Sequence, residues 1–282
     1  MKRICIVSNS LKDKDLSIGK KIRDSFLKLA SDKGMTGAQA PLLDICDVYL
    51  DIPDGMEGII VIGGDGSVLS AAKKSGKHDL PIIGFNLGAI GYLAEVELAN
   101  ADDALTRLLE DNYSVEERMM LAGTVHKDGE DELTDIALND VVLSRRGDMQ
   151  ITCYRICVNG SFLSDFNADG IILSTPTGST AYNLSAGGAI VEPVAKLIQL
   201  TPVAPHMLNT RSVILSGDDE ICVTIMPPKG LRPVDVGAYF DGEMNTTLHP
   251  GDSVRVTMSD HVTRVIRLSD DGFLQTLHKK MI

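Results

Sequence analysis

Tryptophan is absent from this 282-residue chain, and only 4% of its residues are aromatic. Proteins that bind single-stranded nucleic acid stack its bases on aromatic side chains, so this shortage argues against that class. Basic residues are also outnumbered by acidic ones, which gives a formal net charge of -12. A phosphate backbone needs a basic surface. We therefore expect no nucleic-acid partner, although one local basic pocket could still bind a nucleotide.

Long apolar segments are missing as well. No run approaches the roughly 20 apolar residues that a helix needs to cross a bilayer. The apolar stretch near the N-terminus stops at Ser8 without a small-residue cleavage pattern, so it is interpreted as a first strand. The five cysteines, an odd number in a long chain without a secretion signal, indicate reduced thiols. We expect a cytoplasmic protein with no membrane partner.

The first part of the chain alternates short apolar runs with helical patterns. The apolar runs lie at residues 3–8, 58–62 and 80–84, and the helical patterns at 16–33, 67–75 and 101–110. The runs have the β-branched, continuous character of buried strands. Strands that alternate with helices predict parallel βαβ units. We therefore expect an α/β domain with a Rossmann-like parallel sheet over residues 1–115.

From about residue 116, β-like runs follow one another with turn residues between them. Asn159-Gly160 is a strong signal for a two-residue hairpin. Asp241-Gly242 and Pro250-Gly251 separate later runs. We expect an all-β, sandwich-like domain over residues 116–265. The expected strands are 120–126, 133–144, 151–158, 161–166, 212–216, 220–226, 234–240, 253–258 and 262–268.

A glycine-rich loop, Gly-Gly-Asp-Gly-Ser, occupies residues 63–67 after a buried run and before a helical pattern. Glycines let a backbone approach phosphate closely, and the helix start offers free N–H groups to an anion. The carboxylate of Asp65 could accept a hydroxyl proton there or bind the Mg²⁺ that accompanies ATP. The alternative is that Asp65 only caps the helix. The loop matches neither G-x-G-x-x-G nor the P-loop, which weakens oxidoreductase and P-loop interpretations.

A cluster of hydroxyl groups occupies residues 174–180, with the sequence Ser-Thr-Pro-Thr-Gly-Ser-Thr, after a strand-like run that opens with Asp169-Gly170. We expect the cluster to be too polar for the core. A helix cap needs one hydroxyl, and here there are five. A loop that binds ribose and phosphate therefore explains the segment better than a cap or a turn does.

Three further features bear on chemistry. Asn139 and Asp140 interrupt an apolar strand, where they could bind an adenine edge or a ribose, or form a solvent-exposed bulge. Phe85 could wall a base pocket or anchor its loop. No pair of histidines has metal-ligand spacing with a Glu or Cys between, and no Gly-x-Ser-x-Gly elbow occurs. We expect no protein-held metal site and no hydrolase triad.

Taken together, these segments resemble the NAD kinase family. The order matches: residues 63–66, the loop after Phe85, Asn139-Asp140, and 169–183, followed by 201–206. The segment Thr-Pro-Thr-Gly-Ser-Thr-Ala-Tyr is the specific part, because diacylglycerol and sphingosine kinases carry a similar glycine-aspartate loop. The resemblance implies an NAD kinase/diacylglycerol kinase-like fold, in which residues 266–282 return to the N-terminal domain.

The resemblance implies that ATP phosphorylates the adenosine-ribose 2′-hydroxyl of NAD, giving NADP and ADP, with Mg²⁺ accompanying ATP. NAD is expected between the two domains of a homodimer or homotetramer. Asp65 is implied as the general base or metal-organising residue. The residues implied to bind NAD or ATP are Gly63, Gly64, Gly66, Ser67, Phe85, Asn139, Asp140, Asn167, Asp169, Thr177, Thr180, Ala181, Tyr182, Ser185 and Ala204.

Two departures and two alternatives accompany this prediction. Asn167 stands where many family members carry Arg or His, and the chain end lacks an arginine- and phenylalanine-rich tail. A lipid or nucleoside kinase could share the glycine-aspartate loop, but the hydroxyl-rich segment argues against it. A non-catalytic dinucleotide sensor of the same fold would have no need of Asp65.

Overall fold

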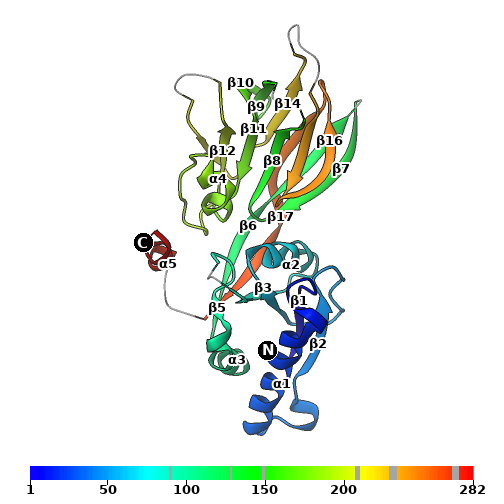
Figure 1. Cartoon of the computed structure of the whole chain (residues 1–282), viewed down its shortest axis with the longest axis vertical. Helices are drawn as coiled ribbons and strands as arrows, with labels where there is room; N and C mark the ends of the chain where they lie inside the picture. Colours follow the sequence, from blue (N-terminus) through cyan, green and yellow to red (C-terminus); the bar gives the residue numbers. More distant parts are fainter. Residues whose placement is uncertain are drawn as a thin grey trace. The chain divides into compact units, whose positions relative to one another are not determined.

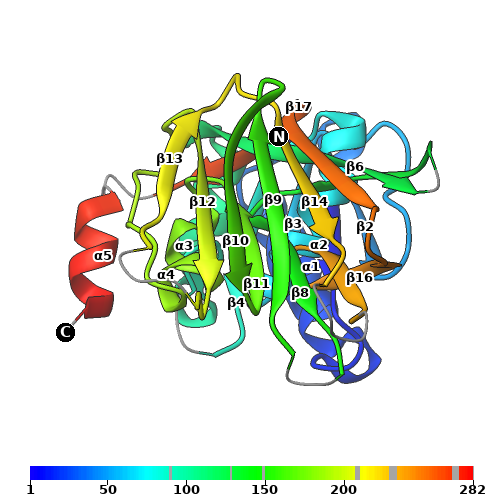
Figure 2. The ribbon, with the colours of Figure 1, turned by 90° about the horizontal axis from the view of Figure 1, so that it is seen from above.

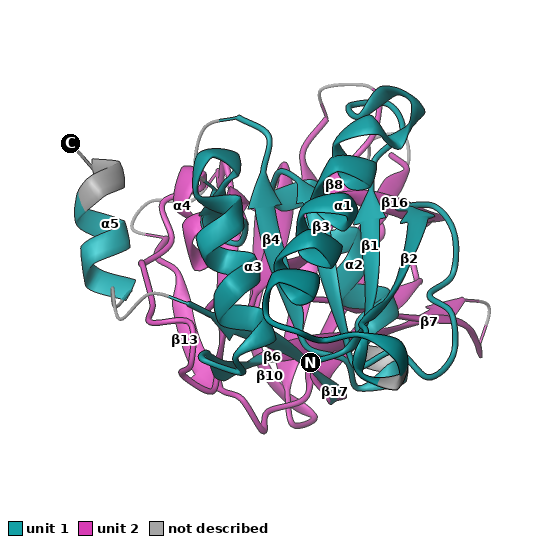
Figure 3. Cartoon of the chain, turned by 90° about the horizontal axis from the view of Figure 1, so that it is seen from below, with its two compact units in different colours: residues 1–118, 261–282 teal, residues 119–260 magenta. Residues whose placement is uncertain are grey.

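The computed structural model describes residues 1–88, 91–127, 129–147, 150–206, 210–228, 234–268 and 273–281, and Figure 1 shows its elements. The chain divides into two compact units, coloured separately in Figure 3. Unit 1 comprises residues 1–118 and 261–282, and unit 2 comprises residues 119–260. Two strands, β6 (Ser114–Lys127) and β17 (Ser253–Arg267), contribute residues to both units.

Unit 1 is built on a parallel sheet in the order β17, β4, β3, β1, β2, with β5 also beside β4. The strands are β1 (Arg3–Ser8), β2 (Leu42–Asp47), β3 (Gly58–Gly63), β4 (Ile82–Asn86) and β5 (Val96–Glu97). Every residue of β3 and β4 is buried. Continuous apolar runs predict such strands because both faces of a parallel sheet are covered.

Three of the helices of unit 1 cover the two faces of this sheet. They are α1 (Ser17–Asp32), α2 (Asp65–His78) and α3 (Ala101–Leu109), with α5 (Phe273–Met281) at the chain end. The neighbouring α1 and α3, seen side by side in Figure 3, bury Phe26 and Leu105 in one core with Ile83 of β4. Because successive strand residues face opposite sides, Gly84 faces α2, where a Cβ would lie 3.1 Å from Val68 Cγ2.

Unit 2 is a sandwich of two sheets. The six-stranded sheet has the order β13-β12-β11-β8-β15-β16 and is antiparallel throughout. Its strands are β8 (Asp140–Arg145), β11 (Gly170–Ser174), β12 (Leu197–Val203), β13 (Val213–Ser216), β15 (Val236–Phe240) and β16 (Glu243–Leu248). Figure 2 shows β12 and β13 side by side in this sheet.

The second sheet of unit 2 has the order β10-β9-β14-β17, and β6 pairs with both β17 and β7. Its further strands are β7 (Glu130–Ala137), β9 (Thr152–Val158), β10 (Ser161–Ala168) and β14 (Ile221–Met226). Tyr154 and Ile156 of this sheet share one buried core with Leu143, Leu173 and Leu200 of the six-stranded sheet. The predicted combination of an α/β part and an all-β sandwich-like part is confirmed.

Several element boundaries differ from the prediction. Residues 133–144 form two strands, β7 and β8, because the backbone from Leu138 to Asp140 hydrogen-bonds outside the ladder. The two strands expected at 253–258 and 262–268 form one strand, β17, which ends at Arg267 and keeps its polar centre in the strand. Strand preference depends on pairing context as much as on the residue. Strands β2, β12 and β16 were not predicted from the sequence.

Helical segments also begin and end at unexpected places. The helix expected at 67–75 begins at Asp65. The hydroxyl cluster leads only into a 3₁₀ turn, η4 (Gly178–Thr180), and the one-turn helix α4 (Tyr182–Ser185). In the described part of the chain, no helix combines the length and apolar character that crossing a membrane requires.

Candidate functional site

The glycine-rich loop joins β3 to α2 in unit 1. Gly63 ends β3, Gly64 is the N-cap of α2, and Asp65 is its first residue. A Cβ on Gly63 would collide with the Ser67 side chain, whereas in the described chain nothing lies within 4 Å of a Cβ built on Gly64 or Gly66. The loop therefore exposes backbone in front of a helix N-terminus, which is where phosphate groups bind favourably.

The Asp65 carboxylate accepts hydrogen bonds from the loop that follows β4. Its Oδ2 accepts the N–H of Tyr92 at 3.0 Å, and its Oδ1 accepts those of Leu93 at 3.1 Å and Ala94 at 3.2 Å. No side chain caps α2, so the helix-cap interpretation of Asp65 is wrong. Because Oδ2 accepts only one of these bonds, it has capacity for another donor.

Gly91 lies directly against this carboxylate. A Cβ built on Gly91 would overlap the Asp65 carboxyl group. Phe85, at the start of the same loop region, is fully buried in the core of unit 1. Phe85 could wall a base pocket or anchor its loop, and its burial supports the anchoring role. The Phe85 ring packs in the core, and the loop beyond it encloses Asp65.

The far side of the loop is anchored by an ion-pair network in unit 1. Glu95 Oε1 accepts the N–H of Leu268 at 3.2 Å, and Glu95 Oε2 pairs with Arg267 Nη1 at 2.7 Å. Arg118 donates to Glu116 at 2.6 Å. Burial lowers the pKa of Arg118, and the charge of Glu116 opposes that effect. The end of β17 thus holds Glu95, which directly follows the Tyr92–Ala94 segment that hydrogen-bonds to Asp65.

We expect Gly91→Ala to reduce turnover by about 100-fold, because the added methyl must displace the Asp65 carboxylate and misplaced groups cost such factors. Gly88→Ala is the matched control, since nothing in the described chain lies within 4 Å of a Cβ there. Steady-state rates and thermal melting of both variants provide the check. Equal rates for the two folded variants would contradict the tight packing of Gly91 on Asp65.

In unit 2, the turn from Leu138 to Asp140 is hydrogen-bonded from two directions. Its three N–H groups donate to the Asp241 carboxylate. The carbonyl of Leu138 accepts from Thr175 Oγ1 at 2.6 Å, and that of Asn139 accepts from the Thr175 N–H at 2.9 Å. Asn139 and Asp140 therefore sit on a fully bonded turn, and the solvent-exposed bulge is excluded because both residues are buried.

The hydroxyl cluster is more buried than expected. Ser174, Thr175 and Ser179 are fully buried, so the expectation that the cluster is too polar for the interior is wrong. Each hydroxyl donates to a backbone carbonyl: Ser174 to Thr175, Thr175 to Leu138, and Ser179 to Val191. These bonds satisfy the hydroxyls without water, which is the condition for burying them.

Beyond Thr177, the later residues of this segment are more accessible. Thr177 is buried, Thr180 and Ala181 are half-buried, and Tyr182 and Ser185 are exposed. The one-turn helix α4 lies next to β12 (Figures 1 and 2), and Thr201 Oγ1 donates to Asn183 Oδ1 at 2.6 Å. The accessible members of the segment can contact a ligand, whereas the buried ones shape the loop.

A polar row crosses the six-stranded sheet on the face opposite its core. Asp140 of β8, Ser174 of β11 and Gln199 of β12 are direct neighbours in register, while the intervening residues face the core. In the described chain both amide atoms of the fully buried Gln199 lack a hydrogen-bond partner, as does Asn139 Oδ1. Buried polar atoms are normally bonded, so these atoms are candidates for ligand or water contacts. Gln199 was missed because a lone Gln in an apolar run carries no motif.

Asp140 is a buried carboxyl group. It is 5% exposed, and no described residue donates a hydrogen bond to its carboxylate. Burial, and then the charge of Asp241, raise the pKa of Asp140 to about 7. Without a protein donor, the Asp140 carboxylate is available to a hydroxyl donor of a ligand.

Replacing Asp140 by Asn should stabilise the ligand-free protein above neutral pH. The pKa is 3.8 for an ordinary Asp and about 7 for folded Asp140, so this group favours folding below 3.8 and loses that contribution as pH rises through 7. At pH 8 the variant should be more stable by on the order of 2–4 kcal/mol, and equal to wild type near pH 4. Urea unfolding at both pH values measures this. The exposed Asp218→Asn serves as control, and equal stability at pH 8 would contradict the burial cost.

A second cluster lies at the other end of β11. Asp169 pairs with Arg145 through Nε–Oδ1 at 2.7 Å and Nη2–Oδ2 at 3.2 Å. Its hydrogen bond to Arg145, and further the charge of His206, lower the pKa of Asp169. The His206 N–H donates to the Asn167 carbonyl at 2.8 Å, and both residues line a cavity of about 520 Å³. Arg145 was not predicted as a site residue, because its partner Asp169 is brought beside it only when β8 pairs with β11.

Ala204 ends the strand beside this cluster with a φ of 45°. Left-handed backbone is costly for residues with a Cβ and persists where the surroundings hold it, often at ligand sites. Asp140 lies opposite the last residue of β11 and Asp169 directly precedes its first, so the two are roughly 17 Å apart along the strand. The structure therefore groups Asn139 and Asp140 with the hydroxyl segment, and Asn167 and Asp169 with Ala204, as two separate clusters.

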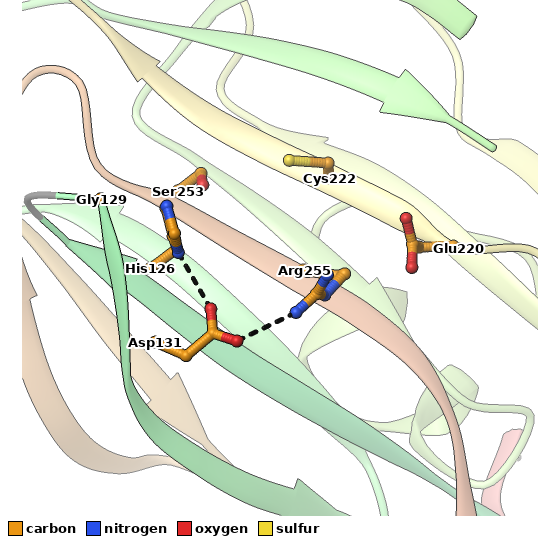
Figure 4. Close-up of a pocket in the computed structure, with 7 residues that line it drawn as sticks. All are labelled: His126, Gly129, Asp131, Glu220, Cys222, Ser253 and Arg255. Carbon is orange, nitrogen blue, oxygen red and sulfur yellow. Dashed lines mark hydrogen bonds and ion pairs between the residues drawn. The ribbon is translucent and has the colours of Figure 1, made fainter. Parts of the chain in front are cut away.

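A further pocket of about 410 Å³ lies on the second sheet of unit 2 (Figure 4). Asp131 already binds two of the pocket's other side chains: His126 Nδ1 lies 2.9 Å from Asp131 Oδ1, and Arg255 Nη2 lies 3.3 Å from Asp131 Oδ2. Glu220, Cys222 and Ser253 complete its lining in Figure 4. None of the residues predicted from the sequence lines this pocket.

Comparison with known proteins identifies the family. Residues 20–113 match the model of the ATP-NAD kinase N-terminal domain, and residues 138–268 match that of the ATP-NAD kinase C-terminal domain. The chain belongs to the ATP-NAD kinase family. The family resemblance noted in the sequence is thereby confirmed.

Relatives of this family align over the whole chain. It is 37% identical to a protein named NAD kinase from Lachnospira eligens, covering 100% of both chains. It is 39% identical to one from Agathobacter rectalis, covering 100% of this chain and 99% of the relative. Both alignments include the two structural units and the loops described above.

Two solved structures share the fold. The yeast NADH kinase complexed with NADH matches with a TM-score of 0.83 at 21% identity, covering 100% of this chain and 87% of that one. The NAD kinase from Archaeoglobus fulgidus in complex with ATP matches with a TM-score of 0.73 at 20% identity, covering 98% of each chain. The NAD kinase fold predicted from the sequence is confirmed.

Proposed function

We propose that this kinase transfers the terminal phosphoryl group of ATP to the 2′-hydroxyl of the adenosine ribose of NAD, giving NADP and ADP. Membership of the ATP-NAD kinase family and full-length relatives named NAD kinase support phosphorylation of NAD. The observation that carries the proposal is Asp65, whose carboxylate is fixed by three backbone N–H groups beside the open glycine loop. A lipid kinase needs a different acceptor pocket from the hydroxyl-rich segment of unit 2.

The glycine loop binds the phosphates of ATP in this proposal. The open backbone of Gly64 and Gly66, and the start of α2 behind it, offer N–H groups and the positive end of a helix dipole. Ser67 Oγ is buried and, in the described chain, has no hydrogen-bond partner. A phosphate-bound water or a phosphate oxygen would satisfy it.

Mg²⁺ accompanies ATP. Among the described residues no group of three or more His, Cys, Asp or Glu could hold a metal ion. Mg²⁺ typically needs only one or two carboxylates together with substrate phosphates, so the phosphates held by the glycine loop would be its main ligands. When bound, the ion neutralises charge on the phosphates.

Asp65 orients the acceptor hydroxyl. Phosphoryl transfer depends mainly on positioning and charge stabilisation, because a ribose hydroxyl is a weak nucleophile at neutral pH. The N–H groups of Tyr92, Leu93 and Ala94 hold the carboxylate in one place without occupying all of Oδ2. That remaining position can accept the 2′-hydroxyl proton, which makes Asp65 the proposed general base.

NAD binding is assigned to unit 2. Asn139 and Asp140 supply an amide oxygen and a carboxylate without protein partners, suited to the adenosine half. Thr177, Thr180, Ala181, Tyr182 and Ser185 line the adenine and ribose pockets in this proposal. Asp169, Asn167 and Ala204 form the separate cluster proposed for the nicotinamide end or its ribose.

A cytoplasmic location and a homodimer or homotetramer complete the proposal. All five cysteines are free, which fits a reducing compartment. The cytoplasmic location was expected from the sequence, and the homo-oligomer from the family resemblance.

Purified protein should form NADP from NAD, ATP and Mg²⁺, and Asp65→Asn should lower kcat by ~10²–10⁴-fold, the usual loss for a positioned base. NAD binding should be retained. Asp79→Asn, which changes a carboxylate at the other end of α2, is the matched control and should keep wild-type turnover. Coupled detection of NADP and calorimetric NAD binding give the two readouts.

Two results would overturn parts of this proposal. Near-normal turnover by a folded Asp65→Asn protein would remove Asp65 from the reaction. A folded wild-type protein that binds NAD and makes no NADP would support a dinucleotide sensor. Phosphorylation of a lipid or nucleoside in place of NAD would support the other kinase class.

A further inference from the structure

We propose that Asp241 is a positioning residue for the NAD site: it holds the backbone of Leu138–Asp140 so that the side chains of Asn139 and Asp140 meet the dinucleotide. This inference rests on the proposed function of unit 2. Asp241 lies outside the short motifs, at residues 63–66, 139–140, 169–183 and 201–206, that carry the family resemblance. It follows β15, about 100 residues after the turn that it binds.

The geometry is that of a carboxylate clamp on three successive amides. Asp241 Oδ2 accepts the N–H of Leu138 at 2.8 Å. Its Oδ1 accepts those of Asn139 at 2.7 Å and Asp140 at 3.2 Å. Its own N–H donates to the Asp140 carbonyl at 3.0 Å. Every amide of the turn is therefore bonded to one residue.

The backbone of Asp241 is shaped for this task. Asp241 and Gly242 have φ values of 52° and 81°, which is the pair of left-handed residues found in a two-residue hairpin turn. The turn joins β15 to β16, and β15 pairs with β8, the strand that Asp140 opens. The hairpin thus delivers the carboxylate to the start of the neighbouring strand.

The clamped turn is confined on its other side by the hydroxyl segment. Thr175 Oγ1 donates to the Leu138 carbonyl at 2.6 Å. A Cβ built on Gly178 would collide with the Asn139 carbonyl. The turn has no room to shift toward Gly178, so loss of the clamp on the Asp241 side would move Asn139 and Asp140 out of position.

Asp241 also acts on Asp140 through its charge. After burial, the Asp241 carboxylate is the remaining cause that raises the pKa of Asp140. The other elements packed against Asp140 present neutral groups: Ser174 is its partner on β11, and residues 175–183 include no charged side chain. Removing the charge of Asp241 should therefore lower the pKa of Asp140.

The test compares Asp241→Asn with wild type. An Asn side chain has one acceptor oxygen, and its NH₂ would face an N–H of the turn. We expect KM for NAD to rise by about 10-fold to 100-fold, as misplaced binding groups do, while KM for ATP stays unchanged. The fall of kcat/KM for NAD on the acid side of pH 7 should move to lower pH, because Asp140 then stays ionised further into acid.

Asp252→Asn is the matched control. Asp252 is also a buried turn residue of unit 2, where it accepts the N–H of His249 at 2.7 Å, but it lies beyond the opposite end of β16. We expect it to lose thermal stability without a change in KM for NAD or in the pH profile. If Asp241→Asn behaves like this control, Asp241 only stabilises its hairpin and the proposal is wrong.

If Asp241→Asn folds poorly, a second variant still tests the proposal. Thr175→Val removes the hydrogen bond to the Leu138 carbonyl without changing charge. It should therefore raise KM for NAD and leave the pH at which kcat/KM for NAD falls in acid unchanged. An unchanged KM would contradict the importance of the turn. If wild-type protein makes no NADP, the proposed function fails, and NAD affinity measured by calorimetry still decides the role of Asp241.

Discussion

Each unit has a candidate region that depends on the same interaction: an aspartate carboxylate that binds three successive backbone N–H groups. Asp65 binds the segment from Tyr92 to Ala94 in unit 1, and Asp241 binds the turn from Leu138 to Asp140 in unit 2. Hydrogen bonds between charged acceptors and amides are roughly twice as strong as neutral ones. Loops that would otherwise sample many conformations are thereby fixed before any substrate binds, which is what positioning catalysis requires.

Each clamp is supported by residues far away in the sequence. Arg267 and Leu268, at the end of β17, hold Glu95 next to the segment that binds Asp65. Thr175 holds the carbonyl side of the turn that Asp241 binds. The end of β17 and the hydroxyl segment thus support the loops that carry the proposed site residues, and catalytic sites commonly need such supporting bonds.

Local patterns were sufficient to predict the fold class and the glycine loop. Continuous β-branched runs predicted the buried strands β1 and β3, and the Gly-Gly-Asp-Gly loop after β3 marked Asp65. Partners distant in sequence could not be predicted, because spacing carries no record of which strands pair. The bonds of Asp65 to the Tyr92–Ala94 amides, the pair Arg145–Asp169, the unpaired Gln199 and the clamp by Asp241 belong to this class. The burial of Thr175 and Ser179 was misjudged because their carbonyl partners, Leu138 and Val191, lie outside the hydroxyl segment.

Amide hydrogen exchange in the ligand-free protein tests the two clamps most directly. We expect protection like that of core strands at the amides of Tyr92, Leu93, Ala94, Leu138, Asn139 and Asp140, although most of them lie outside regular structure. We expect NAD and ATP to change this protection little. Exchange at these six amides as fast as in exposed turns, with protection appearing only on addition of substrates, would contradict a site that is organised in advance.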